Sequence, residues 1–327
     1  MATLDDVAVL AGVSKATASR ALARPELVAR DTIERVRAAA DSLGFQPSRI
    51  ARALARGRTG LLALVVPSLQ NTFFAPIIEG AQAAAEESGN HLTIAVSNLA
   101  SPAGNAGLER LASQVDGLIL NASQASPEVV RHAESLAPTV LIERELSGIP
   151  SVLADTPAAF GELAAEFAAR GHTRIAYMGG PDGSWLDSMR AQAVQDALAG
   201  KAELTLLGPL PPLAESGIRL AEDVLAARAT AVLVYAAPIA LGLMYALQLR
   251  GIRVPQDLVV SGDARIARAL GSSGVPSVDV DGTQVGRQAV ELLLRRLELR
   301  ALEVRGLPVS AQAGPEQRRL AVPVHWS

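Results

Sequence analysis

From residue 61 onward, short apolar runs alternate with longer stretches in which apolar residues recur at helical spacing. Such runs, bounded by turn residues, are typical of buried strands, and their alternation with helices is typical of a parallel sheet. The pattern predicts strands at 61–66, 92–96, 117–120, 139–142, 151–154, 174–178, 204–207, 231–234 and 258–260. The predicted helices between them include 77–87, 158–170, 191–198 and 240–249.

These elements form two successive sets, which predicts two doubly wound α/β subdomains rather than one large sheet. We expect the first at about 61–155 plus 283–312, and the second at about 156–282 plus 313–327. Each of four glycines stands where a predicted helix ends, as C-terminal cap glycines do: Gly44, Gly89, Gly171 and Gly251.

The first 45 residues show short helical segments and tight turns with no strand pattern. Thr3 and Asp6 form a variant of the capping box, Gly12 permits a tight turn, and Ser14 can cap a second helix. Apolar positions on the three predicted helices are expected to face inward: Val7, Ala8, Ala11, Ala18, Ala21, Leu22, Ile33, Val36, Ala40 and Leu43. The spacing therefore predicts an all-α helix-turn-helix unit, with a third helix over 31–43.

The outward positions of the second helix are Lys15, Ala16, Ser19 and Arg20. A face of small and basic residues can enter the major groove of DNA, where arginine can fork onto guanine and a methyl group can touch thymine. The alternative from spacing alone is a three-helix bundle with a solvated basic face.

The charge distribution supports a DNA-binding segment, although the net charge of the whole chain is −3. Residues 1–60 contain ten basic and six acidic side chains, a net charge of +4, and the remainder has a net charge of −7. The absence of cysteine excludes disulfides and thiolate metal sites. We expect no signal peptide and no membrane contact, because the apolar runs are too short, and we predict a cytoplasmic, nucleoid-associated protein.

Two segments make a more specific interpretation possible: TLDDVAVLAGVSKATASRAL at 3–22 and LGFQPSRIARALA at 43–55. Both resemble the signature of the lac-repressor (LacI/GalR) family of transcription regulators, and the likeness extends over essentially the whole chain. The resemblance implies a repressor that binds a palindromic operator in double-stranded DNA as a homodimer, under the control of a small-molecule effector. It divides the chain into a DNA-binding domain (1–46), a hinge helix or linker (47–60) and an effector-binding and dimerisation domain (61–327).

By this resemblance, Lys15, Ala16 and Arg20 read bases, while Thr3, Ser14, Thr17 and Ser19 cap the helices or contact the DNA backbone. Hinge residues implied to contact DNA are Arg49, Ala51, Leu54 and Ala55. Paired hinge helices enter the minor groove, where Leu54 would wedge into the central base step and kink the duplex. The alternative for 47–60 is a flexible charged linker. Two departures, Ala23 in place of Asn and Ala29 in place of Ser, remove phosphate contacts.

For the body, the resemblance implies a periplasmic-binding-protein-like fold with a ligand cleft between its subdomains. The implied effector-binding residues are Phe73, Phe74, Asn121, Glu143, Trp185, Arg190 and Asp263. These side chains suit a sugar or related metabolite, with stacking by Trp185 or Phe73. Alternatives are that the phenylalanines pack only in the core or in a dimer interface, and that Arg190 pairs with Asp187. Tyr235-Ala236-Ala237-Pro238 replaces the Asn-Asp of sugar-responsive relatives, which leaves open a less hydroxylated effector or a degenerate site.

Other classes of protein find less support. The four histidines are scattered, and no catalytic group, metal site or cofactor is predicted. The glycine-rich run at 179–183 follows a strand but lacks the GxGxxG spacing of nucleotide-binding loops. A secreted solute-binding protein would need an export signal and would not use the first 60 residues. A purely structural interaction protein would leave the two-subdomain cleft unexplained.

Overall fold

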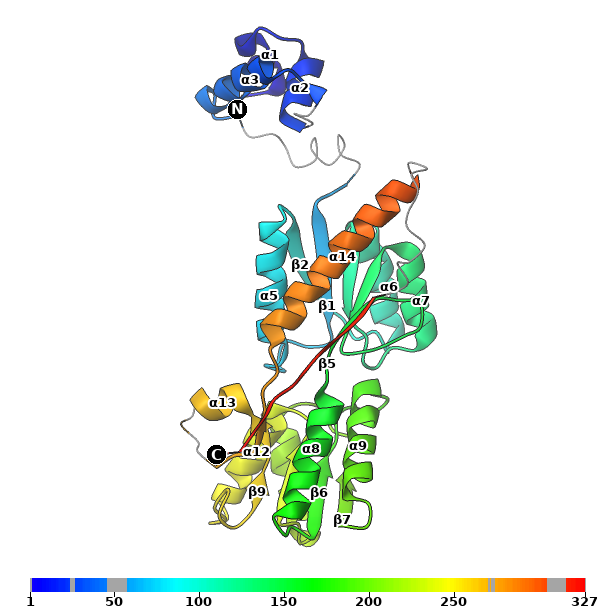
Figure 1. The fold of residues 1–327 in the computed structure, drawn as a ribbon, viewed down its shortest axis with the longest axis vertical. Coiled ribbons are helices and arrows are strands. Elements are labelled where there is room, and N and C mark those ends of the chain that lie inside the picture. The colour runs from blue at the N-terminus through cyan, green and yellow to red at the C-terminus, as the bar shows by residue number, and fades with distance from the viewer. Residues whose placement is uncertain are drawn as a thin grey trace. The chain divides into compact units, whose positions relative to one another are not determined.

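The computed structural model describes residues 2–23, 27–45, 58–269, 271, 274–304 and 316–326. The chain forms two compact units, Met1–Leu61 and Leu62–Ser327 (Figure 1). Within residues 2–23 and 27–45, the first unit forms three α-helices and no strand: α1 (Leu4–Ala11), α2 (Lys15–Ala23) and α3 (Arg30–Ser42). The predicted all-α fold of this segment is confirmed.

The small core of the first unit explains how three short helices can pack closely. Its buried side chains are mostly alanines, which let helix axes approach: Val7, Ala8, Ala11, Ala18, Ala21, Val36, Ala39 and Ala40. Gly12 ends α1 with φ 63°, a left-handed conformation that suits glycine. One inward prediction was wrong: Leu43 is 37% exposed, and Ala39 is buried on that face of α3 instead.

The second unit is α/β and consists of two lobes. The first lobe has a sheet of order β12-β5-β4-β3-β1-β2, and the second has a sheet of order β7-β6-β8-β9. The first sheet contains β1 (Leu61–Val66), β2 (His91–Val96), β3 (Gly117–Asn121), β4 (Thr139–Ile142), β5 (Ser151–Ala154) and β12 (Gln317–Leu320). The second contains β6 (Arg174–Met178), β7 (Glu203–Leu207), β8 (Ala231–Val234) and β9 (Val259–Val260).

Helices cover the sheets on both sides, as their continuously buried strands require. The first lobe has α5 (Phe74–Glu87), α6 (Pro102–Ala112), α7 (Pro127–Leu136) and α14 (Gly282–Val304). The second has α8 (Thr156–Ala169), α9 (Trp185–Leu198), α10 (Ala214–Arg219), α11 (Ala221–Ala226), α12 (Ala237–Gln248) and α13 (Ala264–Ala269). In β6, Ile175 and Tyr177 face α8 and α9, and Ala176 and Met178 face α11 and α12. The predicted doubly wound fold is confirmed.

A small third sheet has the order β10-β11-β13, formed by β10 (Gly262–Asp263), β11 (Ser277–Val278) and β13 (Val324–His325). The chain therefore passes between the lobes three times: from β5 to α8, from β11 to α14, and from β12 to β13 (Figure 1). The assignment of 313–327 to the second subdomain was wrong for β12, because Gln317–Leu320 pairs in parallel with β5.

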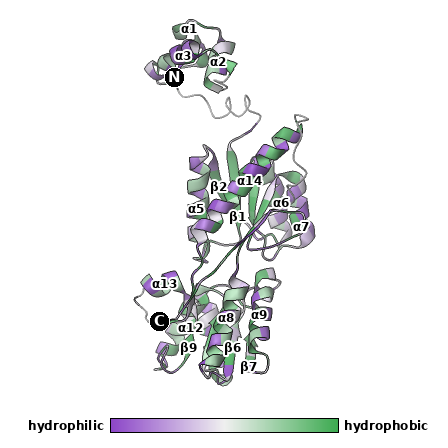
Figure 2. Ribbon diagram, in the orientation of Figure 1, coloured by the Kyte–Doolittle hydropathy of each residue, from purple (hydrophilic) through white to green (hydrophobic). Residues whose placement is uncertain are grey.

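Glycines allow the closest helix contacts in the body. A Cβ at Gly80 of α5 would lie 2.0 Å from the carbonyl oxygen of Thr283 in α14, and one at Gly286 would lie 2.0 Å from that of Ile77. Figure 2 shows the strands mainly in the hydrophobic colour, with polar residues on helix surfaces such as those of α14. No helix among the described residues combines the length and the apolar character needed to cross a membrane.

Candidate functional site

The turn between α1 and α2 holds the second helix in a defined orientation. The Thr3 side chain accepts a hydrogen bond from the Asp6 N–H, and the Asp6 carboxylate accepts one from the Thr3 N–H, so the predicted capping box is present. At α2, the Thr17 N–H donates to Ser14 Oγ (3.1 Å), and the two hydroxyls lie 2.8 Å apart. Ser14 therefore caps α2, as its position in the sequence predicted.

The outer face of α2 presents the predicted base-reading residues to solvent. Lys15, Ala16 and Arg20 are exposed and Ser19 is half-buried, while Ala18 and Ala21 fill the core behind them. Thr3 and Ser14 are also exposed, and Thr17 is half-buried. Six of these seven residues therefore lie at the α1–α2 turn or on α2, and Thr3 lies at the N-terminus of α1. Arg49, Ala51, Leu54 and Ala55 lie outside the described residues.

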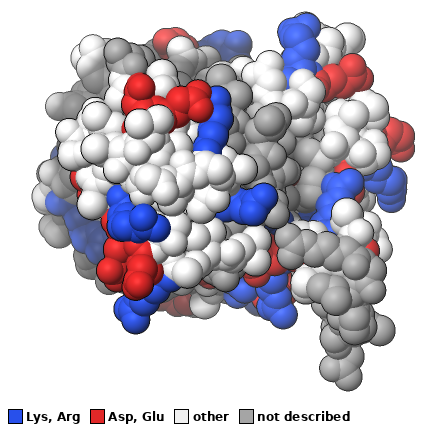
Figure 3. All heavy atoms as spheres, turned by 90° about the horizontal axis from the view of Figure 1, so that it is seen from above, with Lys and Arg blue, Asp and Glu red and all other residues white. Residues whose placement is uncertain are grey.

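The two basic side chains of this face differ in their contacts. Lys15 Nζ lies 2.7 Å from the Asp5 carboxylate, with both side chains about 60% exposed, so water weakens the pair. Arg20 makes no ion pair or hydrogen bond with any residue that the structure describes. Figure 3 shows Lys and Arg interspersed with Asp and Glu on the side of the molecule seen from above.

Ala29 has a structural consequence that the sequence did not suggest. It is the N-cap residue of α3, and no side chain caps that helix end. The Ala-for-Ser departure thus removes a helix cap as well as the implied phosphate contact. Such a cap is worth about 1 kcal/mol.

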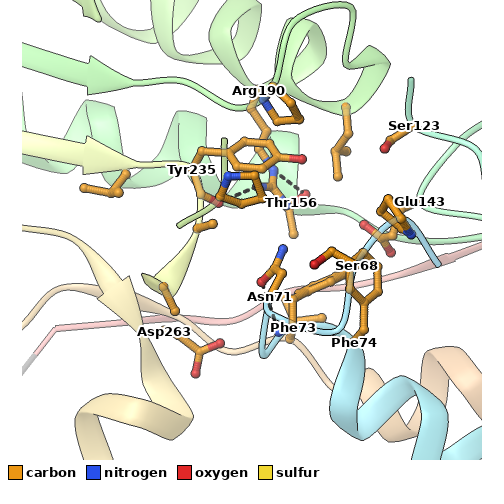
Figure 4. Close-up of a pocket in the computed structure, with 18 of the residues that line it drawn as sticks. Ser68, Asn71, Phe73, Phe74, Ser123, Glu143, Thr156, Arg190, Tyr235 and Asp263 are labelled. Atoms are coloured by element: carbon orange, nitrogen blue, oxygen red, sulfur yellow. Dashed lines mark hydrogen bonds between the residues drawn. The ribbon is translucent and has the colours of Figure 1, made fainter. Parts of the chain in front are cut away.

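A cavity of about 330 Å³ lies between the two lobes of the body. Residues after the strands of both sheets line it, as expected for α/β folds. Six of the seven predicted effector-binding residues are among the lining residues: Phe73, Phe74, Asn121, Glu143, Arg190 and Asp263. Figure 4 shows the phenylalanines and Arg190 on opposite sides, with Asp263 and Glu143 well apart.

Arg190 is 5% exposed and its contacts are with neutral groups. Nε donates to Thr156 Oγ1 (2.9 Å) and Nη1 to the Tyr235 carbonyl oxygen (3.0 Å). The guanidinium carbon lies 4.8 Å from the ring centre of Phe160 and 4.9 Å from that of Tyr235. The alternative that Arg190 pairs with Asp187 fails, because Asp187 instead accepts hydrogen bonds from the Tyr177 hydroxyl and the Gly180 N–H.

Glu143 is fully buried, and its backbone has φ 56°, which is rare for a residue with a side chain. Oε1 accepts a hydrogen bond from the Ala154 N–H (3.0 Å), whereas Oε2 has no partner among the described residues. Burial raises the pKa of this carboxyl to about 7, against the smaller opposing effects of the Ala154 hydrogen bond and the charge of Arg190. Asn121 Oδ1 is likewise buried without a described partner.

The remaining predicted residues have mixed outcomes. Phe74 lines the cavity and also belongs to the core of the first lobe, and its ring meets that of Phe73 edge to face at 5.5 Å. Asp263 Oδ1 accepts a hydrogen bond from the Ile266 N–H (3.1 Å), so this carboxylate also caps α13. Trp185 does not line the cavity; the next residue, Leu186, does. Stacking by Trp185 on a ligand is therefore not supported.

Sequence reasoning missed several lining residues, among them Thr156, Phe160 and Tyr235. Thr156 is the first residue of α8, and Phe160 lies one turn later, directly after the first passage between the lobes. A signal existed for Tyr235, since it opens the segment that departs from the sugar-responsive pattern. Its packing on Arg190 depends on tertiary structure and had no signal in the sequence.

Comparison with known proteins identifies the family. A model of the lacI family of bacterial regulatory proteins matches residues 3–48, and a periplasmic-binding-protein-like domain model matches residues 164–323. The chain is 31% identical over 313 residues to the HTH-type transcriptional repressor PurR of Vibrio cholerae serotype O1 (strain M66-2), covering 91% of this chain and 92% of PurR. It is 26% identical to the regulator KdgR of Bacillus subtilis (strain 168), covering 90% and 91%.

Solved structures agree in fold. The lac repressor dimer bound to operator and the anti-inducer ONPF superposes with a TM-score of 0.81 at 24% identity, over 99% of this chain and 97% of that one. The complex of the transcriptional regulator CelR with cellobiose gives 0.68 at 26% identity, over 99% and 98%. The chain therefore belongs to the lacI family of bacterial regulatory proteins and is a DNA-binding transcription regulator.

Proposed function

We propose that this regulator represses transcription by binding a palindromic operator through α2 of two subunits, and that a small molecule in the cavity sets the operator affinity. The observation that carries the proposal is the exposed face of α2, where Lys15, Ala16 and Arg20 lie opposite a buried alanine core. We assign guanine to Arg20, since arginine can donate two hydrogen bonds to the major-groove edge of that base.

The other predicted DNA contacts fix position rather than sequence. Thr3 at the start of α1 and Ser14, Thr17 and Ser19 at the start of α2 and along it are proposed to contact phosphates. In the linker, Arg49, Ala51, Leu54 and Ala55 are proposed to enter the minor groove, with Leu54 as the apolar wedge.

We propose a homodimer because one copy of α2 contacts only a few base pairs. A palindromic operator has two half-sites and therefore requires two copies of α2. The solved lac repressor relative is a dimer on its operator. The structure offers an apolar stripe for such contact on α12, where Leu241, Tyr245 and Leu249 are 38%, 56% and 69% exposed at four-residue spacing. We propose that a second copy of the chain covers this stripe.

The cavity is proposed as the effector site. Related structures hold small organic molecules, ONPF in the lac repressor and cellobiose in CelR. Phe73, Phe74, Asn121, Glu143, Arg190 and Asp263 are the proposed effector-binding residues, and Trp185 is no longer among them. We propose that the protein binds this ligand without transforming it, and that it acts in the cytoplasm.

The test first selects an operator for the wild-type protein from random duplexes, and then measures binding of Arg20→Ala to duplexes that carry systematic changes in it. The variant is expected to lose discrimination at one guanine in each half-site by about 1–3 kcal/mol. Arg37→Ala is the matched control, because Arg37 is also exposed but lies on α3. Unchanged base preference in Arg20→Ala, or equal losses in both variants, would refute the assignment of Arg20.

A further inference from the structure

One wall of the cavity offers few of the free polar groups that a sugar would need. Three of its polar side chains, Asn71, Ser261 and Asp263, already accept hydrogen bonds from backbone N–H groups. The wall after β8 consists of small or apolar side chains around one aromatic ring: Val234, Tyr235, Ala236, Ala237 and Ala240. A ligand rich in hydroxyl groups would leave many of them without partners on this wall, at a cost for each.

The buried guanidinium of Arg190 belongs to the only Lys or Arg side chain among the described lining residues. No described carboxylate lies within ion-pair distance of it, and its described hydrogen bonds go to a hydroxyl and a carbonyl oxygen. The guanidinium also packs on the rings of Phe160 and Tyr235, which leaves its edge for hydrogen bonds with a ligand. Figure 4 shows the Tyr235 ring beside Arg190. A buried cation without a counter-ion is costly, and an anionic group on the ligand would offset that cost with charge-assisted hydrogen bonds.

A single cation favours a single negative charge. Asp263 lies far across the cavity from Arg190 in Figure 4, so it does not compete for the guanidinium. Glu143 Oε2 and Asn121 Oδ1 are buried oxygens without described partners.

We propose that the effector is a small monocarboxylic acid, whose carboxylate binds Arg190 and whose apolar or aromatic body lies against Phe73 and Tyr235. This inference rests on the proposed function only in treating the cavity as the effector site. It replaces the expected sugar with a ligand that has one charge and few hydroxyl groups.

The first test uses the wild-type protein and matched ligands. Isothermal titration is carried out with benzoate, 4-hydroxybenzoate and cyclohexanecarboxylate, with the amide of each as its neutral counterpart, and with ribose and glucose. At least one carboxylate is expected to bind about 10- to 100-fold more tightly than its amide, since a charge-assisted pair is lost in the amide. The proposal is overturned if no carboxylate binds, if the amides bind equally well, or if only the sugars bind.

The second test removes the charge of Arg190. Arg190→Gln is expected to weaken carboxylate binding about 10- to 100-fold and to leave amide binding within about 3-fold. Equal loss for both ligands would indicate a collapsed cavity, and retained selectivity for the carboxylate would refute the role of Arg190. The wild-type comparison of acid with amide does not depend on the folding of this variant.

A third readout is the uptake of protons on binding. The charge of Arg190 lowers the pKa of Glu143, so an anion at Arg190 raises that pKa and Glu143 takes up protons near neutral pH. The other titratable groups lining the cavity are Arg190 on α9 and Asp263 at β10, with Tyr235 after β8. Carboxylate affinity is expected to fall between pH 6 and pH 8, and amide affinity is not. Equal pH dependence for both would count against the proposed geometry.

Operator binding measured in the same titrations separates this inference from the proposed function. If a carboxylate binds in the cavity but operator affinity does not change, the ligand class is right and the regulatory role is wrong. If ribose or glucose changes operator affinity and no carboxylate binds, the regulatory role stands and the inferred ligand class is wrong.

Discussion

The buried carboxyl of Glu143 makes a specific prediction about stability and pH. Its pKa is about 7 in the folded protein and 4.5 in the unfolded chain. Below pH 4.5 both states hold the proton. Between pH 4.5 and 7 the unfolded chain loses it and the folded protein keeps it, so the free energy of unfolding falls as pH rises. Above pH 7 the loss is complete, and 2.5 pH units correspond to about 3 kcal/mol.

The substitution Glu143→Gln removes this titration while keeping a neutral side chain that can accept the hydrogen bond from the Ala154 N–H. Urea unfolding of both proteins, followed by circular dichroism from pH 4.5 to pH 8.5, gives the difference in their free energies of unfolding. We expect little difference at the acid end and a gain for the variant of up to about 3 kcal/mol at pH 8. Titrations elsewhere in the chain cancel in this difference.

Glu128→Gln is the control, because Glu128 is exposed and the hydrogen bond with the Ser126 side chain lowers its pKa. A lowered pKa confines its effect to pH values below 4.5, so its difference from wild type should be flat from pH 5 to pH 8. A Glu143→Gln difference that is equally flat would show that the buried carboxyl is ionised throughout, and the reasoning from burial would be wrong.

Three further predictions test other parts of the chain. Leu54→Ala should weaken operator binding and reduce DNA bending in a circular-permutation assay, with ligand affinity unchanged; wild-type bending would contradict the wedge. Ala29→Ser should raise the free energy of unfolding of the first unit by about 1 kcal/mol by capping α3, and an unchanged urea midpoint would argue against this. Gly80→Ala should lower the melting temperature, since its Cβ would meet the carbonyl oxygen of Thr283, whereas Gly107→Ala has open space and should not.

The fold could be predicted well from the sequence because its strands are continuously apolar. The strands β1, β4, β5, β6 and β8 begin and end where the pattern placed them. The elements without such a run were missed. The strand β12, Gln317–Leu320, has two arginines, and it is a strand because it pairs with β5 at the edge of the sheet. No local pattern indicates such a pairing, so the sequence placed this segment in the wrong lobe.

The site could be predicted in position but not in chemistry. Side chains that follow the strands meet between the lobes by topology, and so six predicted residues line one cavity. Whether a side chain points toward that cavity depends on tertiary packing. For this reason Leu186 lines the cavity and the predicted Trp185 does not. The isolation of Arg190 from any described carboxylate also required the structure, because Asp187 is close in sequence but is bound elsewhere.

A ligand can regulate the protein by shifting the equilibrium between two arrangements of the lobes. The size of that shift is limited by the difference between the ligand's affinities for the two arrangements. Glu143 lies where such a change can be sensed. It follows β4 with a strained φ of 56°, and its carboxyl binds the N–H of Ala154, the last residue before the chain passes to the second lobe. Its other carboxyl oxygen, Oε2, is buried without a described partner. Glu143 and Thr156, the first residue of α8, both line the cavity. A ligand that changes the protonation or the contacts of Glu143 therefore acts directly on this passage between the lobes.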